Sequence, residues 1–262
     1  MPDTTPTHPF RPGTVTLVGA GPGDPELLTL KAVRAIQSAT VLLVDDLVND
    51  AVLAHASPSA RVVHVGKRGG CKSTPQAFIE KLMVMAAREG EVVVRLKGGD
   101  PFIFGRGGEE VEHLQAQGIA VQVVNGITAG LAGLSSLGVP LTHRDHAHGV
   151  VFITGHAKPG DAGTDWQALA ATAHSAKLTL VIYMGVSQAS QIEQDLLTGL
   201  PAHTPLAIIQ HASLPQQRHA VTTLGLLSAT LQREGLGSPS VIVVGDVLSG
   251  LAALAQPAVR SA

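Results

Sequence analysis

Three kinds of residue are scarce in this sequence, and each scarcity excludes a class of protein. One cysteine, Cys71, stands among 262 residues, so no internal disulfide can form and a reducing compartment is expected. Aromatic residues make up 3% of the chain, which disfavours a protein that binds single-stranded nucleic acid by stacking bases on aromatic rings. Charged residues make up 15%, against about 25% in a typical domain. This composition excludes a disordered protein built from charged tails.

Long apolar runs and a strong net charge are also missing. No run approaches the roughly 18 uninterrupted apolar residues that a membrane-spanning helix needs. Residues 1–13 contain no apolar segment of the kind found in secretory signals. The net charge of −2 provides no basic field that would attract nucleic acid or an anionic membrane. We therefore expect a cytoplasmic α/β protein with neither nucleic acid nor membrane among its partners.

Short apolar runs alternate with helical patterns along the chain, and 45% of the residues are hydrophobic. The expected strands span residues 14–18, 41–44, 61–65, 92–96, 121–124, 150–154, 179–183, 206–210 and 240–244. The expected helices span residues 26–38, 75–89, 109–117, 127–141, 165–174, 188–198 and 224–233, with Thr74 capping the second and Gly90 ending it. Strands that alternate with helices up to residue 124 predict a parallel sheet covered on both faces, and a second α/β series follows. We expect a loose arm over residues 1–12 and two α/β domains over 13–145 and 146–262.

The first glycine-rich loop, between the first strand and the first helix, allows two interpretations. Residues 19–25 read GAGPGDP, and Asp45 follows about 20 residues later, as in a dinucleotide-binding fingerprint. However, Asp24 replaces the third glycine of that fingerprint and would repel a pyrophosphate. Pro22 and Pro25 also remove backbone donors. The alternatives are a plain tight turn or a helix start with Asp24 as cap and Pro25 in the first position.

Two further loops are rich in glycine. Residues 66–73, GKRGGCKS, nearly match a phosphate-binding loop, but Cys71 stands where its second glycine belongs. This segment is either an exposed basic loop or an anion-facing loop over a cleft. Residues 98–108 contain five glycines between a strand and a helix. Because ligands of open α/β sheets bind at the carboxyl ends of strands, we expect this last loop to face a ligand.

Two long motifs resemble the signature sequences of a known family, the tetrapyrrole methylases. They are VGAGPGDPELLTLKA at residues 18–32 and VRLKGGDPFIFGRGGEE at residues 94–110. The resemblance extends from about Gly13 to about Leu248, with further matches at residues 65–68, 126–129, 140–144 and 183–185. It implies two αβα domains with the active-site cleft between them, and a homodimer.

The resemblance also implies an activity. Members with these motifs use S-adenosyl-L-methionine and no metal to methylate uroporphyrinogen III at C2 and C7. The products are precorrin-2, which leads to sirohaem and cobalamin, and S-adenosyl-L-homocysteine. Other members, such as a precorrin methylase, a diphthine synthase or a ribosomal RNA 2′-O-methylase, remain alternatives. Outside the family, the alternatives are an NAD-dependent oxidoreductase, based on the first loop and Asp45, and a cofactor-binding sensor without catalysis.

The family's functional positions carry over to this chain residue by residue. The resemblance assigns Asp45 as proton acceptor and Lys67 as proton donor, with Arg106 as a further catalytic residue. The positions that line the cofactor are Pro22, Gly98, Gly99, Asp100, Ile103, Thr128, Ala129, Met184 and Ala212. At position 212 relatives often carry glycine. A substrate with eight carboxylates needs clustered cations, and arginine binds carboxylates through two parallel hydrogen bonds. The candidates are Arg68, Arg106 and Arg144, with Lys67 and Lys72 beside them.

Two polar clusters are expected to have structural roles. His143, Asp145, His146 and His148 invite a metal interpretation, but their spacing is loose and no cysteine joins them. We expect this segment to be a linker. Glu193 and Asp195 are expected to lie on a solvated helix face.

Overall fold

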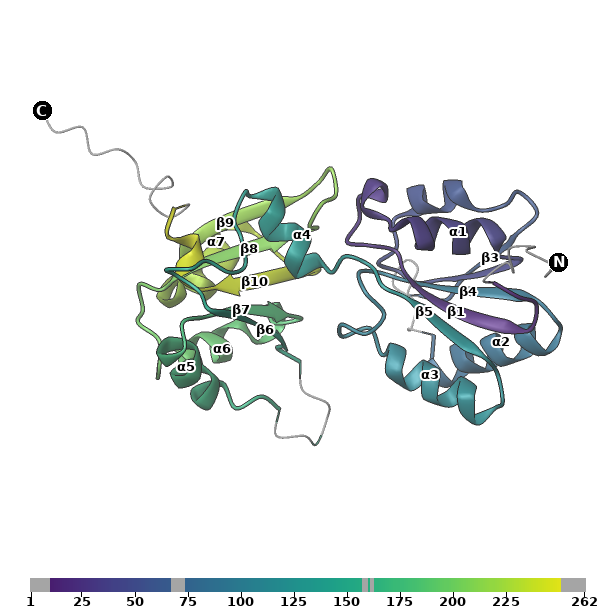
Figure 1. Ribbon diagram of the computed structural model, residues 1–262. Helices are drawn as coiled ribbons and strands as arrows, with labels where there is room; N and C mark the ends of the chain where they lie inside the picture. Colours follow the sequence, from purple (N-terminus) through teal and green to yellow (C-terminus); the bar gives the residue numbers. More distant parts are fainter. Residues whose placement is uncertain (1–9, 67–73, 157–159, 161–162, 251–262) are drawn as a thin grey trace, which may run out of the picture. The chain divides into compact units, whose positions relative to one another are not determined.

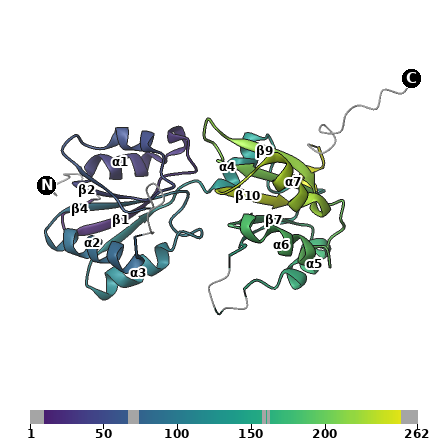
Figure 2. The same cartoon turned by 180° about the vertical axis from the view of Figure 1, so that it is seen from behind.

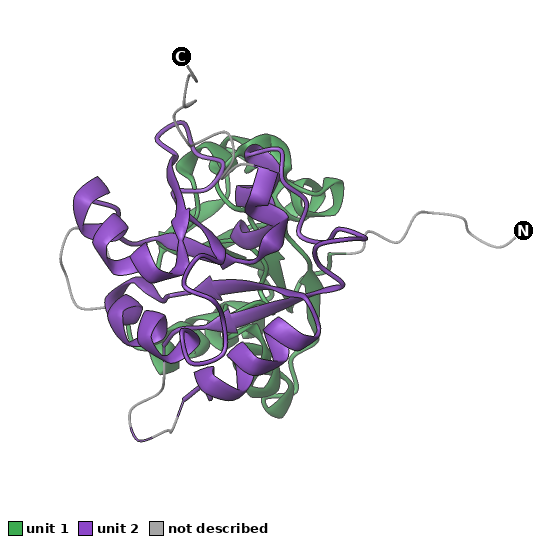
Figure 3. Ribbon diagram, turned by 90° about the vertical axis from the view of Figure 1, so that its left-hand side faces the viewer, with its two compact units in different colours: residues 1–128 green, residues 129–262 purple. Residues whose placement is uncertain are grey.

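The computed structural model describes residues 10–66, 74–156, 160 and 163–250. The chain forms two compact units, residues 1–128 and 129–262, which Figure 3 colours separately. This division falls between Thr128 and Ala129, whereas the sequence predicts a boundary near residue 145. The difference arises because helix α4 (Ala129–Ser136) packs on strands of the second unit, with Leu134 in the same apolar cluster as Val181 and Val243.

The first unit contains a five-stranded sheet in the order β3-β2-β4-β1-β5. All its pairings are parallel, as the alternation of strands and helices predicts. Its strands are β1 (Thr14–Gly19), β2 (Val41–Val44), β3 (Arg61–His64), β4 (Val92–Lys97) and β5 (Val121–Val124). The parallel arrangement places the carboxyl ends of all five strands at one edge of the sheet.

Helices cover both faces of this sheet (Figure 1). One face carries α1 (Leu30–Ser38) and the 3-10 turn η2 (Asp50–His55), and the other carries α2 (Gln76–Arg88) and α3 (Gly107–Ala116). Successive residues of a strand point to opposite faces, so Val94 packs in the cluster of α1 and Val93 in the cluster of α2 and α3. Both faces are buried, which explains the continuous apolar runs of these strands.

Two predicted details of the helices need correction. The single helix expected over residues 26–38 is divided into a 3-10 turn, η1 (Pro25–Leu27), and α1, because each piece has its own cap. Asp24 accepts a hydrogen bond from the Glu26 backbone and Thr29 from the Ala32 backbone, so the predicted role of Asp24 is confirmed. The expectation that Thr74 caps α2 is wrong: Pro75 holds that position without a side-chain hydrogen bond.

The second unit contains a mixed sheet in the order β6-β7-β10-β8-β9. Only β6 and β7 pair in parallel, and the other three pairings are antiparallel. Its strands are β6 (Gly149–Thr154), β7 (Leu178–Tyr183), β8 (Pro205–Gln210), β9 (Arg218–Thr223) and β10 (Ser240–Val244). The sequence analysis missed β9, an edge strand that follows β8 after a short connection and has no fully buried residue.

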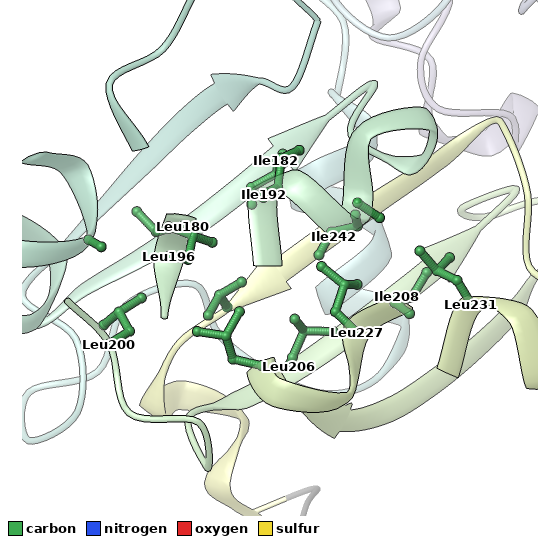
Figure 4. Packing of buried hydrophobic residues seen from close by; sticks show 14 of the residues in the cluster. Leu180, Ile182, Ile192, Leu196, Leu200, Leu206, Ile208, Leu227, Leu231 and Ile242 are labelled. Atoms are coloured by element: carbon green, nitrogen blue, oxygen red, sulfur yellow. The ribbon is translucent and has the colours of Figure 1, made fainter. Parts of the chain in front are cut away.

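Two apolar clusters lie on the faces of this mixed sheet. On one face α5 (Trp166–Ser175), α6 (Ala189–Leu196) and α7 (Leu227–Glu234) bury leucines and isoleucines against the strands (Figure 4). On the other face α4 packs beside the 3-10 turn η5 (Asp246–Leu248). Two more 3-10 turns, η3 (Val186–Gln188) and η4 (Leu224–Leu226), precede α6 and α7. Within the described residues of both units, no helix has the length and hydropathy that crossing a membrane requires.

Candidate active site

Loops that follow the strands of the first unit emerge at the carboxyl edge of its parallel sheet (Figure 2). Pro22 follows β1, Asp45 follows β2, Gly98–Asp100 follow β4, and Thr128 lies four residues after β5. The fold therefore brings these sequence-predicted residues to one edge, where ligands of open α/β sheets bind. Their roles remain predictions.

Three glycine backbones pack against one another at this edge. The loops after β1 and β4 are joined by two backbone hydrogen bonds, from Gly21 N to Gly99 O at 3.2 Å and from Gly99 N to Gly21 O at 2.7 Å. A Cβ atom on Gly126 would lie 2.1 Å from Gly99 O, and one on Gly19 would lie 2.5 Å from Gly126 N. No side chain fits at these two positions, so here glycine serves close packing of the loops.

Asp100 is buried, with 6% of its surface exposed, and its carboxylate already has protein partners. Oδ1 accepts a hydrogen bond from Phe102 N at 2.8 Å. Oδ2 accepts hydrogen bonds from Asn125 Nδ2 at 3.0 Å and from Gly126 N at 3.1 Å. The side chain thus ties the loop after β4 to the loop after β5. Sequence reasoning considered Asp100 as a ligand-binding carboxylate and missed this structural use.

Asp45 presents a more accessible carboxylate at the same edge. Its side chain is 33% exposed and lies 3.5 Å from the guanidinium of Arg95, measured from Oδ1 to Nη2. Its backbone N–H donates to Leu96 O at 3.1 Å, which fixes the residue to β4. Asp45 is therefore a partly exposed carboxylate paired with a buried cation.

Behind Asp45 lie three charged side chains that we call the buried ion cluster: Arg95 and Lys97 of β4, and Glu110 of α3. Each is at most 4% exposed. Glu110 Oε1 accepts from Arg95 Nε at 3.3 Å, from Lys97 Nζ at 3.2 Å and from Gln76 Nε2 at 3.1 Å. Burial, together with the nearby positive charge of Arg95, lowers the pKa of Lys97, and Glu110 opposes this shift only in part.

Sequence reasoning gave the buried ion cluster no role, although a signal was present. Arg95 and Lys97 interrupt an apolar run at alternate positions, which places both on one face of a buried strand. Glu110 precedes the fully buried Leu114 by four residues and so shares its helix face. Charges of opposite sign at core-facing positions of neighbouring elements predict a buried ion pair.

Arg106 lies in the loop before α3 and is well exposed. Its guanidinium Nε donates to Glu109 Oε1 at 2.9 Å, and this hydrogen bond raises the pKa of Arg106, so the side chain is a permanent cation. A hollow of about 400 Å³ lies beside it, lined by Pro101, Phe102, Arg106, Gly107, Gly108, Glu109 and Glu112. A ligand carboxylate that binds Arg106 must compete with Glu109. Ile103 lies in the same loop and is half-buried.

The predicted cofactor positions of the second unit also gather at one edge of their sheet. Met184 directly follows β7, and Ala212 lies two residues after β8. The strand register places Tyr183 opposite Val241 and Gln210 opposite Ser240, so the two loops flank the start of β10. Met184 is exposed. Ala212 is 5% exposed and packs in the apolar cluster of α4.

Ala129, the remaining position, begins α4, and the next residue ties this helix to the end of β7. Gly130 N donates to the Tyr183 hydroxyl at 2.8 Å. A Cβ atom on Gly130 would lie 2.5 Å from that hydroxyl oxygen. The start of α4 and the loop carrying Met184 are thus held together within the second unit.

Strained backbone conformations coincide with the candidate loops. Among the described residues, six that are not glycine have a positive φ. Five of them lie in loops after β4, β7 and β8, namely Phe104, Arg106, Met184, His211 and Ser213. Only Lys177 lies elsewhere. Such conformations cost free energy and cluster at functional sites, which supports these loops as ligand-binding segments.

The remaining predicted cations are Lys67, Arg68, Lys72 and Arg144. Lys67, Arg68 and Lys72, with Cys71, lie outside the described residues. Arg144 is exposed in a turn closed by hydrogen bonds between His143 and Ala147.

The structure also describes the two polar clusters that were expected to have structural roles, residues 143–148 and the pair Glu193 and Asp195. Among the residues whose placement is described, no group of three or more His, Cys, Asp or Glu could hold a metal ion. His143 and His146 instead stack, with ring centroids 4.6 Å apart. The expectation of a solvated Glu193 is wrong, because its Oε2 accepts a hydrogen bond from Ser228 N at 2.8 Å and so links α6 to the start of α7. Asp195 is half-buried and accepts from Gln191.

Comparisons with known proteins identify the family of this chain. The family model of tetrapyrrole (corrin/porphyrin) methylases matches residues 14–228. A uroporphyrinogen-III C-methyltransferase of Pseudomonas aeruginosa is 53% identical over 251 residues, which cover 95% of this chain and 99% of the relative. The crystal structure of a uroporphyrin-III C-methyltransferase from Thermus thermophilus, complexed with S-adenosyl homocysteine, is 40% identical with a TM-score of 0.75. This match covers 90% of this chain and 99% of the Thermus thermophilus chain.

A cobalt precorrin-4 methyltransferase has the same fold, with a TM-score of 0.79 and 26% identity over 90% of this chain and 96% of that one. The family match covers most of the chain, and the Pseudomonas relative is matched over nearly its whole length. The chain belongs to the tetrapyrrole (corrin/porphyrin) methylases.

Proposed function

We propose that this chain is an S-adenosyl-L-methionine-dependent C-methyltransferase that converts uroporphyrinogen III to precorrin-2 by methylation at C2 and C7. The observation that carries the proposal is the carboxyl edge of the first unit. There the fold brings Pro22, Asp45, Gly98, Gly99 and Thr128 together. The 53% identity with a relative named for this activity supports the choice of substrate.

The residues at this edge fit a cofactor without phosphates. S-adenosyl-L-methionine carries a sulfonium, an ammonium, a carboxylate and a ribose. The loop after β1 offers few donors to a pyrophosphate, because Pro22 and Pro25 lack an N–H and Asp24 places a carboxylate at the start of η1. The loop after β4 instead offers the backbone of Gly98, whereas the N–H and C=O of Gly99 already bond to Gly21. These features argue against the NAD-dependent alternative.

The chain's own residues would orient the acceptor and remove a proton. The cofactor supplies an electrophilic methyl group on sulfur, which is already a good leaving group. Holding two reactants in line can contribute about 7–11 kcal/mol. Asp45 would accept the proton that the methylated tetrapyrrole loses, and Arg106 and Arg144 would bind its carboxylates. Met184 would pack against the cofactor. The assignment of Lys67 as proton donor and of Arg68 as a substrate ligand rests on the family resemblance alone.

Three features of the family remain predictions for this chain. They are a homodimer, a cytoplasmic location and one active-site cleft shared by both units. The use of the product for sirohaem or for cobalamin also remains open to experiment.

Anaerobic incubation with S-adenosyl-L-methionine and uroporphyrinogen III, followed by mass spectrometry of the tetrapyrrole, tests the proposal. The expected result is a gain of two methyl groups with release of S-adenosyl-L-homocysteine. If the protein binds the cofactor but leaves the tetrapyrrole unchanged, the acceptor is a different one, such as a later precorrin. If neither ligand binds, the proposal fails.

A further inference from the structure

The proposed chemistry assigns no task to the buried ion cluster of Arg95, Lys97 and Glu110. This cluster lies under the carboxyl edge of the parallel sheet, on the face covered by α2 and α3. Arg95 pairs with Leu43 across the strands, so the next residues on the same face are Lys97 and Asp45. The cluster is therefore directly behind the carboxylate that we propose as the base.

Arg95 is fixed by contacts on every side of its guanidinium. Nε donates to Glu110 Oε1 at 3.3 Å, and Nη1 donates to Leu43 O at 3.3 Å and to Leu96 O at 3.1 Å. Nη2 is the remaining nitrogen, and it faces Asp45 Oδ1 at 3.5 Å. The side chain is 2% exposed, while that of Asp45 is 33% exposed. A planar cation held by several hydrogen bonds thus pairs with one oxygen of a partly exposed carboxylate.

The cluster is arranged in a way that stability alone does not explain. One oxygen of Glu110 binds both cations, and Glu110 Oε2 has no hydrogen-bond partner among the described residues. Replacing such buried charges with apolar residues of similar volume is often neutral or stabilising. With two cations and one buried anion, the cluster carries an excess positive charge that Asp45 balances. Asp45 is thus the second counter-ion of the cluster, beside Glu110.

We propose that Arg95, anchored by Glu110, is a positioning residue that fixes the carboxylate of Asp45 at the carboxyl edge for proton transfer. This inference rests on the proposed function, because it assumes that Asp45 is the base. Arg95 contacts no ligand in this account. It acts through Asp45, and Glu110 acts through Arg95.

A double-mutant cycle on the full chain tests the proposal. The rates to compare are those of methyl transfer to uroporphyrinogen III by the wild type, Arg95→Met, Asp45→Asn and the double variant. We expect Arg95→Met to lower kcat by roughly tenfold or more, within the range that a positioned base contributes. The KM for S-adenosyl-L-methionine should stay within about twofold. In the Asp45→Asn background, Arg95→Met should lower kcat by less than about twofold, because its target is already lost.

Two further variants separate positioning from folding. Lys97→Met removes a cation of equal burial that binds the same Glu110, and it should reduce kcat much less than Arg95→Met does. Arg95→Lys keeps the charge but loses the planar fork, and it should recover part of the rate. If Arg95→Met does not fold, the Arg95→Lys variant and its combination with Asp45→Asn complete the cycle.

The outcomes distinguish the inference from the proposed function. Full activity of Asp45→Asn would remove the base from the proposed function, whatever Arg95 does. A second outcome is that Asp45→Asn is slow and the double variant loses kcat by the product of the two single fold-losses. That outcome would overturn the positioning role of Arg95 and leave the proposed function intact. Equal losses for Lys97→Met and Arg95→Met would also overturn it, since they would indicate a general effect of the buried charge.

Discussion

The two units contain five-stranded sheets, but they bury very different side chains. Among the described residues, the buried charged side chains are Arg95, Lys97, Asp100 and Glu110, and all four lie in the first unit. The buried polar residues of the second unit are Thr179, Thr204 and Thr230, and none is charged. Buried charges cost free energy unless they are paired, so a unit that keeps them has a use for them.

The second unit differs from the first in its loops as well as in its core. Met184, which directly follows β7, and His211, which directly follows β8, have φ values of 54° and 53°. Both strands are mostly apolar. In the first unit the equivalent edge is held by close glycine packing and by the carboxylate of Asp100. Strained loop residues occur in both units, since Phe104 and Arg106 of the first unit also have positive φ. The comparison indicates that the first unit positions buried charged groups, whereas the second carries its loops on an apolar scaffold.

The largest expected effect on stability comes from removing the negative charge of the buried ion cluster. Glu110→Gln should lower the free energy of unfolding by about 3–5 kcal/mol, because it leaves two buried cations without their shared anion. The matched change in the second unit, Leu180→Ala, should cost about 2–5 kcal/mol through a cavity. Urea unfolding monitored by circular dichroism measures both.

A control uses the triple variant Arg95→Met, Lys97→Met and Glu110→Leu. It should recover most of the stability lost in Glu110→Gln, yet remain slow in methyl transfer. A triple variant that is as unstable as Glu110→Gln would mean that the cluster serves the fold rather than the site.

The next largest effect is expected at the glycine packing of the first unit. Gly126→Ala would place Cβ 2.1 Å from Gly99 O, a backbone atom that cannot move without displacing the loop after β4. We expect a loss of roughly 3 kcal/mol in stability and weaker binding of S-adenosyl-L-homocysteine by calorimetry. The matched change, Gly133→Ala in α4, meets its nearest atom, a side-chain carbon of Ile209, at 3.3 Å and should change stability by less than about 1 kcal/mol. Similar losses for both variants would contradict the difference between the units.

Substitutions of Arg106 and of Glu109 should change the KM for uroporphyrinogen III in opposite directions. Arg106→Ala should raise the KM for uroporphyrinogen III by roughly 10–100-fold, the value of a hydrogen bond to a charged group. Glu109→Gln should lower the same KM, because it weakens the competitor that occupies the guanidinium. The KM for S-adenosyl-L-methionine serves as the control and should not change. An equal rise of both KM values in Arg106→Ala would show that Arg106 does not select the tetrapyrrole.

The smallest expected effect is a pH dependence that comes from Lys97. Its folded-state pKa lies below its ordinary value of 10.5, so between these two values the unfolded chain binds more protons than the folded one. The stability of the wild type should therefore rise relative to that of Lys97→Met as the pH increases toward 10.5. Melting temperatures of both proteins between pH 7 and 10 measure this difference. A constant difference over that range would show that Lys97 has an ordinary pKa in the folded state.

Much of the first unit could be predicted from the sequence, because its pattern is local. The strands 41–44 and 121–124 were predicted with their observed bounds, and Asp24 caps η1 as expected. The loops after parallel strands must lie at one edge of the sheet, so the sequence also predicts that Asp45 and Gly98 lie at the same edge. The link from Asp100 to Asn125 could not be predicted, because it depends on how two loops, 25 residues apart, meet in space.

The second unit was predicted less well for a physical reason. Strand direction depends on which strand lies beside which, and this is not written in the local pattern. β10 enters between β7 and β8 and is antiparallel to both, and β9 has the partly exposed surface of an edge strand. Met184 and Ala212 are assigned by family resemblance, like the cofactor positions of the first unit, and the structure adds that Ala212 is buried.

Single-turnover formation of precorrin-2 by Asp45→Asn, compared with that of Asp50→Asn, tests the central claim most directly, because the base acts on the methylated tetrapyrrole. Both variants keep the shape of the side chain, and Asp50 is an exposed carboxylate of the same unit in η2. The account predicts that Asp45→Asn binds S-adenosyl-L-methionine normally but forms precorrin-2 from uroporphyrinogen III roughly 100-fold more slowly or worse, while Asp50→Asn matches the wild type. A rate for Asp45→Asn within twofold of the wild type would contradict the claim that the carboxyl edge of the first unit supplies the base.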